Sequence, residues 1–334
     1  MVNPPSLLTA ASLALLSFLA LPAQAEVYKF EVLPTLGSPA TGALSIANNN
    51  WVAGNSSVSG ASVATLWKKK KPLNYQPDGF SSTEALGLNA AGDVVGWGKM
   101  DNNLYAVHWR HGKYHTLPAL PGNPYPLLAT AVNEAGQIAG VSGDHAVLWS
   151  GDTVTSLDGS GRGSLGTPTG INAAGTVVGN VVVYGTGLGA AKWTGGQTVR
   201  LHMSGMYSNA RGINDADRTV GCSNLNDDTL TMHATRWDGT VGVVLADLSP
   251  SFYSSSCANA INNADVIVGY SAGVAARWTG DTVVDLNQLL TQTVRDQGWR
   301  LDDATGINDA GIIVGHAHNT VTGESVFYRL TSKQ

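Results

Sequence analysis

The sequence predicts an all-β fold, a seven-bladed β-propeller of four-stranded blades, and three observations carry that prediction. A phrase such as "GINDAGIIVG" (306–315) occurs seven times, at intervals of 39 to 48 residues. A second pattern of a small residue, two variable residues and an aromatic one follows each copy, as in "AVLW" (146–149). The stretches around both patterns are short, rich in β-branched residues and separated by Gly, Asn and Asp, which is typical of strands joined by tight turns.

Residues 1–25 are expected to be a signal peptide. Residues 5–21 carry no charge, and the segment ends in Ala23-Gln24-Ala25, which matches the small-residue pattern of a cleavage site. The mature chain would then begin at Glu26 and be secreted to the periplasm or the exterior. A membrane anchor is the alternative, although the apolar run is shorter than the ~20 residues that a spanning helix needs.

Residues 27–37, "VYKFEVLPTLG", resemble the end of a repeat rather than its start. The last repeat shows the reverse, because only "RLTSKQ" follows its "SVFY" (325–328), and it therefore lacks a fourth strand. We expect residues 27–37 to supply that strand and close the ring, which removes exposed sheet edges. A β-solenoid is the alternative architecture, but its coils are usually shorter and it needs caps.

The repeats divide a single domain, residues 26–334, into seven stacked units. Aligned copies of the phrase end at Gly54, Gly96, Gly140, Gly179, Gly221, Gly269 and Gly315. The apolar position of the phrase is Ile46, Leu88, Val132, Ile171, Ile213, Ile261 and Ile307. The expected blades lie near 43–84, 85–128, 129–167, 168–208, 209–256, 257–302 and 303–334.

Each repeated residue has an expected packing role. In the "NDAG" turn the Asn or Asp side chain can bond its own backbone two residues on, and the Gly can adopt a positive φ, as expected at Gly175 and Gly311. The Trp of the second pattern is expected to cover the core between blades. Function should therefore lie in residues that differ between repeats.

The two cysteines are expected to form a disulfide between blades. Cys222 directly follows the fifth repeat glycine, and Cys257 precedes the first strand of the sixth repeat. Both positions lie near the same rim of adjacent blades, and an exported chain with an even number of cysteines permits a bridge. Two free buried thiols are the alternative.

The phrase "INDAGIIVG", together with "HAVLW" (145–149) of the third copy, resembles the HAF repeats of extracellular bacterial proteins. The His-Ala pair of that signature is present at His145-Ala146 and His233-Ala234, while Val147 and Thr235 replace its Phe. The resemblance covers nearly the whole mature chain. It implies a secreted repeat protein, and it brings no established reaction or catalytic residue.

Charge and composition limit the partners. The formal net charge of −5 gives no reason to expect nucleic acid or an anionic membrane as a partner, and "KKKK" (68–71) is interpreted as a solvated turn. We expect no cofactor, no membrane insertion after signal cleavage, and a monomer.

No motif predicts a catalytic residue. "GYSAG" (269–273) matches the nucleophile elbow, but that motif works on a strand–turn–helix, whereas Ser271 follows a blade strand. His316 and His318 are weak candidates for a metal site, since residues two apart on a strand share a face. Hydrogen-bonded surface histidines are the favoured interpretation.

The face that carries the variable loops is the expected binding surface. The candidate ligand-binding residues are the aromatic ones of the long crossovers and neighbouring strands: Tyr75, Phe80, Trp97, Tyr125, Tyr253 and Trp299. The favoured function is a secreted, non-enzymatic binding module for a glycan or a protein. A polysaccharide hydrolase or lyase with carboxylates near the axis, and a structural envelope or matrix protein, are the alternatives. Two or three carboxylates within ~10 Å in a central funnel would indicate the enzyme.

Overall fold

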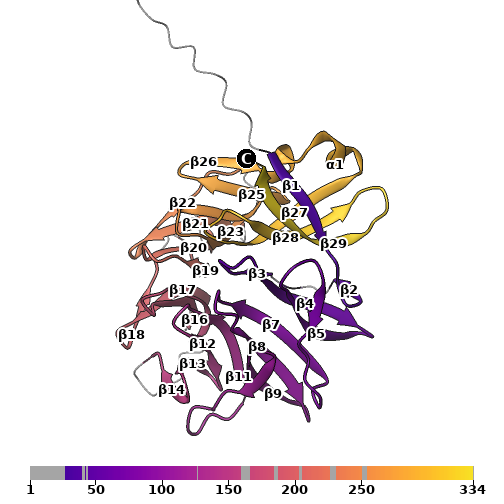
Figure 1. Cartoon of the computed structure of the whole chain (residues 1–334). Coiled ribbons are helices and arrows are strands. Elements are labelled where there is room, and N and C mark those ends of the chain that lie inside the picture. The colour runs from indigo at the N-terminus through magenta and orange to yellow at the C-terminus, as the bar shows by residue number, and fades with distance from the viewer. Residues whose placement is uncertain are drawn as a thin grey trace, which may run out of the picture.

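The computed structural model describes residues 27–39, 42, 44–125, 127–158, 166–183, 187–202, 205–225, 231–249 and 254–333. The expected signal peptide and Tyr253 lie outside these residues. Seven antiparallel sheets are arranged in a ring (Figure 1), which confirms the seven-bladed β-propeller.

Each blade consists of four antiparallel strands, and the innermost strand comes first; the strands follow one another in the chain in blades one to six. Blade one holds β3 (Ser45–Ile46), β4 (Val52–Val58), β5 (Ala61–Trp67) and β6 (Pro72–Asn74), with β2 (Ser38–Pro39) also on β4. Blade two holds β7 (Ser82–Leu88), β8 (Val94–Met100), β9 (Asn103–Arg110) and β10 (Lys113–Thr116). Blade three holds β11 (Leu127–Val132), β12 (Gln137–Ser142), β13 (His145–Ser150) and β14 (Thr153–Ser156). Blade four holds β15 (Thr167–Ile171), β16 (Val177–Val183), β17 (Gly187–Thr194) and β18 (Gln197–Arg200).

The remaining blades follow the same order. Blade five holds β19 (Ser208–Ile213), β20 (Arg218–Ser223), β21 (His233–Asp238) and β22 (Val241–Val244). Blade six holds β23 (Ser256–Ile261), β24 (Val266–Ser271), β25 (Val274–Thr279) and β26 (Thr282–Asp285). Blade seven holds β27 (Trp299–Ile307), β28 (Ile313–Asn319), β29 (Ser325–Lys333) and β1 (Val27–Leu33). The crossover before β27 contains two short helices, η1 (Leu286–Leu289) and α1 (Gln292–Asp296), which are too short to show helical periodicity in the sequence.

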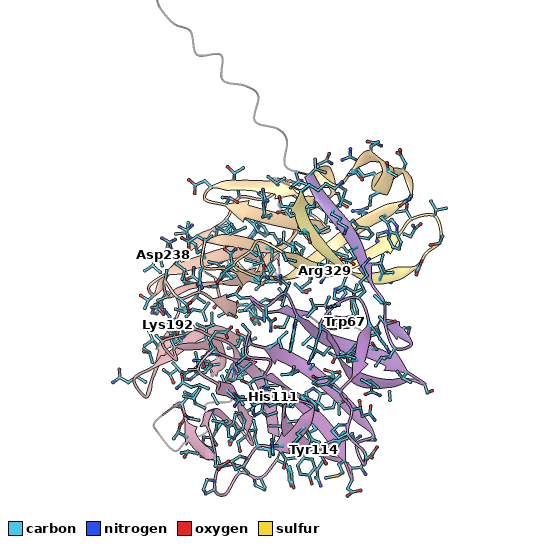
Figure 2. The ribbon with its side chains drawn as sticks, in the orientation of Figure 1. Trp67, His111, Tyr114, Lys192, Asp238 and Arg329 are labelled. Atoms are coloured by element: carbon cyan, nitrogen blue, oxygen red, sulfur yellow. A yellow bond between two sulfur atoms is a disulfide. The ribbon has the colours of Figure 1, made fainter. Side chains whose placement is uncertain are left out.

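The first strand of the chain closes the ring, as the sequence predicts. β1 pairs antiparallel with β29 through seven residue pairs, from Val27 opposite Lys333 to Leu33 opposite Phe327. The Arg329 guanidinium, labelled in Figure 2, donates to the Glu31 carboxylate at 2.6 Å across this pairing. The last blade is thus built from both ends of the described chain.

In every blade, the turn between the first two strands contains one residue with a positive φ, in the left-handed backbone conformation. Gly175 and Gly311 have φ of 81° and 73°, which confirms the expectation for these glycines. In the copies that lack glycine, Asn50, Asp217 and Asp265 hold the same position with φ between 61° and 66°. Asn and Asp tolerate this conformation better than other side chains do.

The repeated asparagine binds one blade to the next. Its side-chain oxygen accepts from the backbone N–H four residues on, as Asn89 does from Asp93 at 2.9 Å, so the predicted two-residue bond is wrong for most copies. Its side-chain amide donates to the carbonyl of the equivalent residue in the following blade, from Asn89 to Asn133 at 2.9 Å. Equivalent bonds run on from Asn133, Asn172, Asn214, Asn262 and Asn308. Blade one has Ala47 at this position, and the side chain of Asn49 reaches Ala90 O instead, at 2.8 Å.

The Trp of the second pattern fills the space between blades, as predicted. Trp67, Trp149, Trp193, Trp237 and Trp278 are fully buried, and Tyr328 takes the same place in blade seven. Trp67 (Figure 2) packs edge-on against Phe327 of the neighbouring blade, with ring centroids 5.9 Å apart. Its indole N–H donates to Pro34 O at 2.6 Å.

The predicted disulfide is present between blades five and six. It joins Cys222 of β20 to Cys257 of β23, with the Cα atoms 4.8 Å apart. In two other blades the residue after the repeat glycine is asparagine, and its side chain accepts from the inner strand of the next blade. Asn180, for example, accepts from Ala210 N at 3.0 Å. The disulfide therefore replaces a hydrogen bond that ties other blades together.

Candidate functional site

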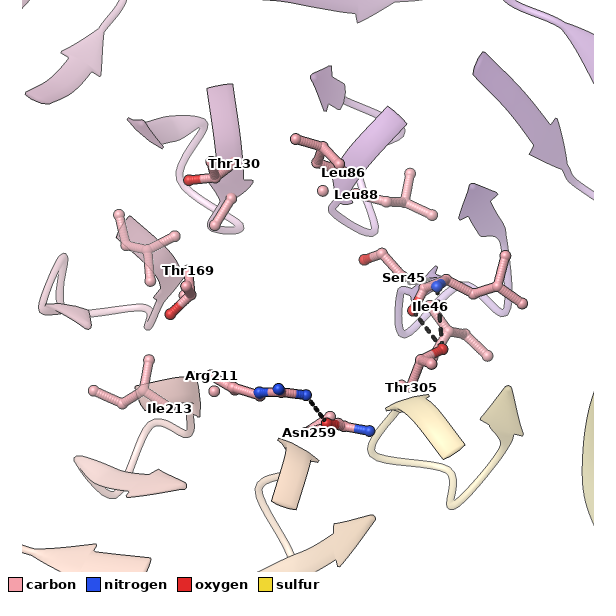
Figure 3. Close-up of a pocket in the computed structure, with 18 of the residues that line it drawn as sticks. Ser45, Ile46, Leu86, Leu88, Thr130, Thr169, Arg211, Ile213, Asn259 and Thr305 are labelled. Atoms are coloured by element: carbon pink, nitrogen blue, oxygen red, sulfur yellow. Dashed lines mark hydrogen bonds between the residues drawn. The ribbon is translucent and has the colours of Figure 1, made fainter. Parts of the chain in front are cut away.

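The innermost strands surround an axial cavity of about 830 Å³ (Figure 3). The apolar residues of the repeat form a collar around the axis: Ile46, Leu88, Val132, Ile171, Ile213, Ile261 and Ile307. A second, smaller cavity of about 170 Å³ lies on the other side of this collar, among the repeat turns. Each inner strand runs from its crossover to its repeat turn, so the large cavity opens toward the crossovers and variable loops.

A β-bulge in the inner strands turns an additional residue toward the axis. In β19, for example, the pairing register shifts between Ala210 and Gly212, and Arg211 lies between them. Because a bulge leaves its extra residue unpaired, it re-aims that side chain. The residues at this position that line the cavity are Leu86, Thr130, Thr169, Arg211, Asn259 and Thr305. They comprise one leucine, three threonines, one arginine and one asparagine, whereas the collar residues after them are all aliphatic.

Three consecutive blades supply a polar chain on one wall of the cavity. The Arg211 guanidinium Nη1 donates to Oδ1 of Asn259, as Figure 3 shows. The amide of Asn259 in turn donates to Asp303 Oδ1 at 2.7 Å and to Ala304 O at 2.9 Å. Asn259 therefore links the cation to the carboxyl group, and these two do not need to pair directly.

Burial shifts the pKa values of two side chains on this wall, Asp303 and His316. Desolvation raises the pKa of Asp303 to about 6, although the Arg211 charge and the Asn259 hydrogen bond favour the carboxylate. Burial lowers the pKa of His316, which pairs across the strands with Asp303 and also lines the cavity. The Nε2 atom of His316 is buried and has no hydrogen-bond partner among the described residues.

Hydroxyl and apolar groups complete the cavity. The side chains of Thr130, Thr169 and Thr305 donate to backbone carbonyls, at 3.1 Å in Thr130 and 2.9 Å in Thr169. Their oxygens keep acceptor capacity toward a ligand, because a hydroxyl has two lone pairs. Leu86 and the collar supply apolar surface. The charged groups of the lining lie in blades five and seven, threonine hydroxyls come from blades three, four and seven, and blades one and two contribute mainly aliphatic side chains.

One carboxylate, that of Asp303, lies among the described residues that line the axial cavity. The adjacent Asp302 instead contacts His318, whose Nδ1 lies 2.7 Å from its carboxylate. The pair of carboxylates that would indicate a glycoside hydrolase is therefore not found in this part of the chain.

The aromatic candidates that the structure describes do not line the axial cavity, and Phe80 is the clearest correction. The sequence predicts an exposed loop residue, but Phe80 is only 5% exposed, since its ring lies over Gly98, where no side chain occupies the space. Phe80 packs edge-on against Tyr105 and against Tyr114, which is labelled in Figure 2; the ring centroids are 6.5 and 5.8 Å apart. Tyr125 joins this group through Tyr105, at 5.4 Å between rings. We call these four residues the aromatic rim cluster; Tyr114 and Tyr125 are each 44% exposed in it.

The other aromatic candidates among the described residues have separate surroundings. Tyr75 is half-buried against Trp109, with ring centroids 6.5 Å apart. Trp97 is half-buried on β8 and hydrogen-bonds to Glu84, whose pKa burial raises. Trp299 is half-buried at the start of β27, where it packs 5.4 Å from Phe30 of the closing strand, and it is therefore part of the blade core rather than a free loop residue.

The expectation of hydrogen-bonded surface histidines holds for His318, which contacts Asp302, and is wrong for His316, which lines the axial cavity and has a buried Nε2 without a partner among the described residues. No group of three potential metal ligands occurs among the residues described. Ser271 is buried where β24 leads into β25, and its hydroxyl accepts from Leu248 N at 3.0 Å. His233 lies 3.0 Å from Asp247, so this histidine of the His-Ala pair connects its strand to the following crossover.

The sequence reasoning missed Arg211, Asn259 and Asp303. One signal could have found the first two, since they occupy the position two residues before the repeated aliphatic residue. That position varies inside an otherwise constant phrase. A bulge cannot be recognised from the pattern alone, and alternation in a regular strand would not by itself have placed these side chains at the axis.

No described protein family matches this sequence, and no curated protein does. Solved structures show the same fold. The β-propeller domain of the Trilobed protease from Pyrococcus furiosus has a TM-score of 0.56 at 10% identity, with 93% of this chain and 96% of that one covered. A puromycin-hydrolyzing peptidase from Mycobacterium tuberculosis has a TM-score of 0.52 at 11% identity, with 88% of this chain and 55% of that one covered. At these identities the likeness concerns the fold alone.

Proposed function

We propose that this chain is a non-enzymatic binding module that holds a glycan or a protein segment on its variable-loop face, with the axial cavity as the main pocket. The observation that carries the proposal is the convergence of Arg211, Asn259 and Asp303 from three blades on one wall of an 830 Å³ cavity. A cavity of this size with a few convergent polar groups and apolar walls is the usual form of a small-molecule or glycan site.

Binding is favoured over hydrolysis because Asp303 is the single carboxylate among the described lining residues. Hydrolysis of a glycosidic bond usually needs two carboxyl groups on opposite sides of the bond. Thr130, Thr169 and Thr305 suit hydrogen bonding to a polar ligand rather than nucleophilic attack, since each hydroxyl donates its proton to a backbone carbonyl.

The aromatic rim cluster is the second candidate site. Tyr114 and Tyr125 expose ring surface on blade two and its crossover, and exposed tyrosines are favourable contacts in binding surfaces. The rings of the cluster meet edge-on, so they do not form one flat surface on which a sugar could stack. The axial cavity therefore remains the favoured site.

We also propose that the module is exported and belongs with the HAF-repeat proteins. The disulfide between Cys222 and Cys257 suits an oxidising compartment. No helix in the described part of the chain is long and apolar enough to cross a membrane. N-terminal sequencing of the protein from the culture medium or periplasm should find Glu26 as the first residue, and retention of residues 1–25 would contradict cleavage.

The function is tested by blocking the cavity. Residues 26–334 are screened on an array of glycans and peptides, and hits are measured by calorimetry. Thr169→Trp places a large side chain at the axis and should abolish binding, while Val241→Trp, on the exposed outer strand, should bind like the wild type. If binding survives Thr169→Trp but is lost in Tyr114→Ala, the site is the aromatic rim cluster. Turnover of a bound polysaccharide would support the hydrolase or lyase instead.

A further inference from the structure

Arg211 has unused hydrogen-bonding capacity at the centre of the molecule. Among the residues that the structure describes, its Nη1 has one partner, Asn259, and its Nε and Nη2 atoms have none. It is the one arginine or lysine that lines the axial cavity in the described residues. A guanidinium offers five donors in a planar fork, which matches the two oxygens of a carboxylate.

Asn259 holds the Arg211 guanidinium in place, and the bond it makes is to a neutral amide rather than to a carboxylate. Asn259 is fixed by its own bonds to Asp303 and Ala304, and it anchors one end of the Arg211 guanidinium. Asp303 stands on the far side of Asn259. This bond leaves the remaining donors of Arg211 available to a ligand. Because the side chain is already held in one conformation, it loses less conformational entropy when a ligand binds.

The rest of the cavity suits a sugar ring. Thr130 and Thr169 present hydroxyl groups from blades three and four, and Leu86 with the collar presents apolar surface. A sugar has hydroxyls on its edge and C–H groups on its faces, so it can use both kinds of wall. A peptide C-terminus could use the fork but has fewer hydroxyl groups for the threonines.

We infer that the axial cavity recognises the carboxylate of a uronic acid residue in a glycan, with the free donors of Arg211 as its partner and the cavity threonines facing the sugar hydroxyls. This inference rests on the proposed binding function and names its ligand class.

Acidity should strengthen this binding. The ionisable groups around the Asp303 carboxyl are Arg211 of β19, Asp302 of β27 and His316 of β28. The Tyr328 hydroxyl of β29 donates to the backbone carbonyl of Asp303. Above its pKa of about 6, Asp303 is negative and opposes a second carboxylate; below that pKa it becomes neutral and leaves the Arg211 charge uncompensated. A uronate stays ionised at about pH 5.5, since a carboxyl group in water has a pKa near 4.

The test compares acidic and neutral ligands of the same length. Calorimetry at pH 7 uses residues 26–334 with oligogalacturonates, their methyl esters, and peptides with a free C-terminus. We expect the wild type to prefer the acid over the ester by at least about tenfold, the order of a charge-assisted bidentate contact. Arg211→Gln should remove that preference, and Arg236→Gln, an arginine of the same blade outside the axial cavity, should keep it.

Two further variants keep the test decisive if Arg211→Gln folds poorly. Arg211→Lys retains the charge but not the fork and should lose most of the preference, and Asp303→Asn should bind uronate at pH 7 as tightly as the wild type does at about pH 5.5. Equal affinity for acid and ester in the wild type overturns this inference but leaves the binding function standing. Binding of peptides in place of uronates overturns the ligand class. Failure of the wild type to bind any glycan or peptide on the array overturns the proposed function itself.

Discussion

At the scale of single residues, the repeated asparagine does more than shape its turn. Asn262 is 5% exposed; its side-chain oxygen accepts from Val266 N at 2.9 Å and its amide donates to Asn308 O at 3.0 Å in the next blade. Its oxygen also accepts from Ala264 N at 3.1 Å, so one side chain satisfies two part-buried backbone donors and one buried carbonyl. The repetition of asparagine therefore follows from contacts between blades as well as from the turn.

Replacing Asn262 by Ala should destabilise the protein by about 2–3 kcal/mol, because one buried carbonyl and two part-buried backbone N–H groups lose their partner. The neighbouring Asn263 bonds Asp215 and Asp309 at the exposed surface, so Asn263→Ala should cost less than about 1 kcal/mol. Urea unfolding of both variants measures the difference. Equal losses would show that the buried bonds have no special weight.

The turn glycine gives a test of backbone strain alone. Gly311 has a φ of 73°, and a Cβ there would meet no heavy atom within 4 Å. Gly311→Val should therefore cost about 1–2 kcal/mol through its conformation rather than a clash. Gly311→Asn should cost clearly less, since Asn50 holds the equivalent position in blade one. Thermal melts that rank the two variants the other way would contradict this account.

The loop aromatics differ in how much packing they carry. Trp299→Ala should cost about 2–3 kcal/mol, because Trp299 packs against Phe30 of the closing strand and belongs to the core around it. Tyr125→Ala should cost under about 1 kcal/mol, because Tyr125 is 44% exposed. Melts of the two variants give the comparison, and a larger loss for Tyr125 would mean that the rim supports the fold.

Asp303 should make the stability depend on pH. Its folded pKa of about 6 lies above its ordinary value of 3.8, so between these values the folded state binds more protons than the unfolded state. This group's contribution therefore becomes less favourable as pH rises from about 4 to 6. Asp303→Asn should raise the stability at pH 7 by on the order of 2 kcal/mol and have little effect at pH 4. Unfolding curves at both pH values check the sign; destabilisation at pH 7 would contradict it.

At the scale of the strands, the contacts between neighbouring blades are interchangeable. Asn55 and Asn180 accept from the inner strand of the next blade, and the disulfide joins β20 to β23 in the same manner. The residue after the repeat glycine can thus connect two blades either by a hydrogen bond or by a disulfide. The disulfide should contribute more, because it also restricts the unfolded chain.

Removal of the disulfide by Cys222→Ala with Cys257→Ala should cost roughly 3–4 kcal/mol, as expected for a closed loop of 35 residues in the chain-entropy model. Cys222→Asn with Cys257→Ala should recover part of that loss by restoring the hydrogen bond of the other blades. Denaturant unfolding under oxidising conditions measures both double variants. No difference between them would mean that the asparagine geometry does not transfer to this blade.

At the scale of the whole molecule, β1 holds the ring closed. It covers the free edge of β29, and its Tyr28 and Leu33 are buried. Deleting residues 26–37 should therefore expose a strand edge and lower the melting temperature or cause aggregation. Removal of residues 1–25 alone leaves β1 in place and serves as the control. An unchanged melt after the longer deletion would contradict the clasp.

The sequence by itself determined the blade number, the closing strand and the disulfide. These features follow from patterns that repeat along the chain: the phrase ending at Gly315 counts the blades, and the orphan segment 27–37 matches the strand missing after "SVFY". Cys222 and Cys257 could be paired because a repeat fixes which positions of adjacent blades meet. Because equivalent residues of each repeat occupy equivalent positions in each blade, the spacing along the sequence predicts which residues lie close together.

Only the tertiary structure decided where the polar residues meet. Arg211, Asn259 and Asp303 belong to three blades, and a bulge, rather than a sequence pattern, directs Arg211 and Asn259 to the axis. Phe80 is buried because Gly98 of the neighbouring strand leaves room for its ring. Both outcomes depend on contacts between particular side chains within a blade or between neighbouring blades, and a pairwise contact of that kind leaves no periodic trace along the chain.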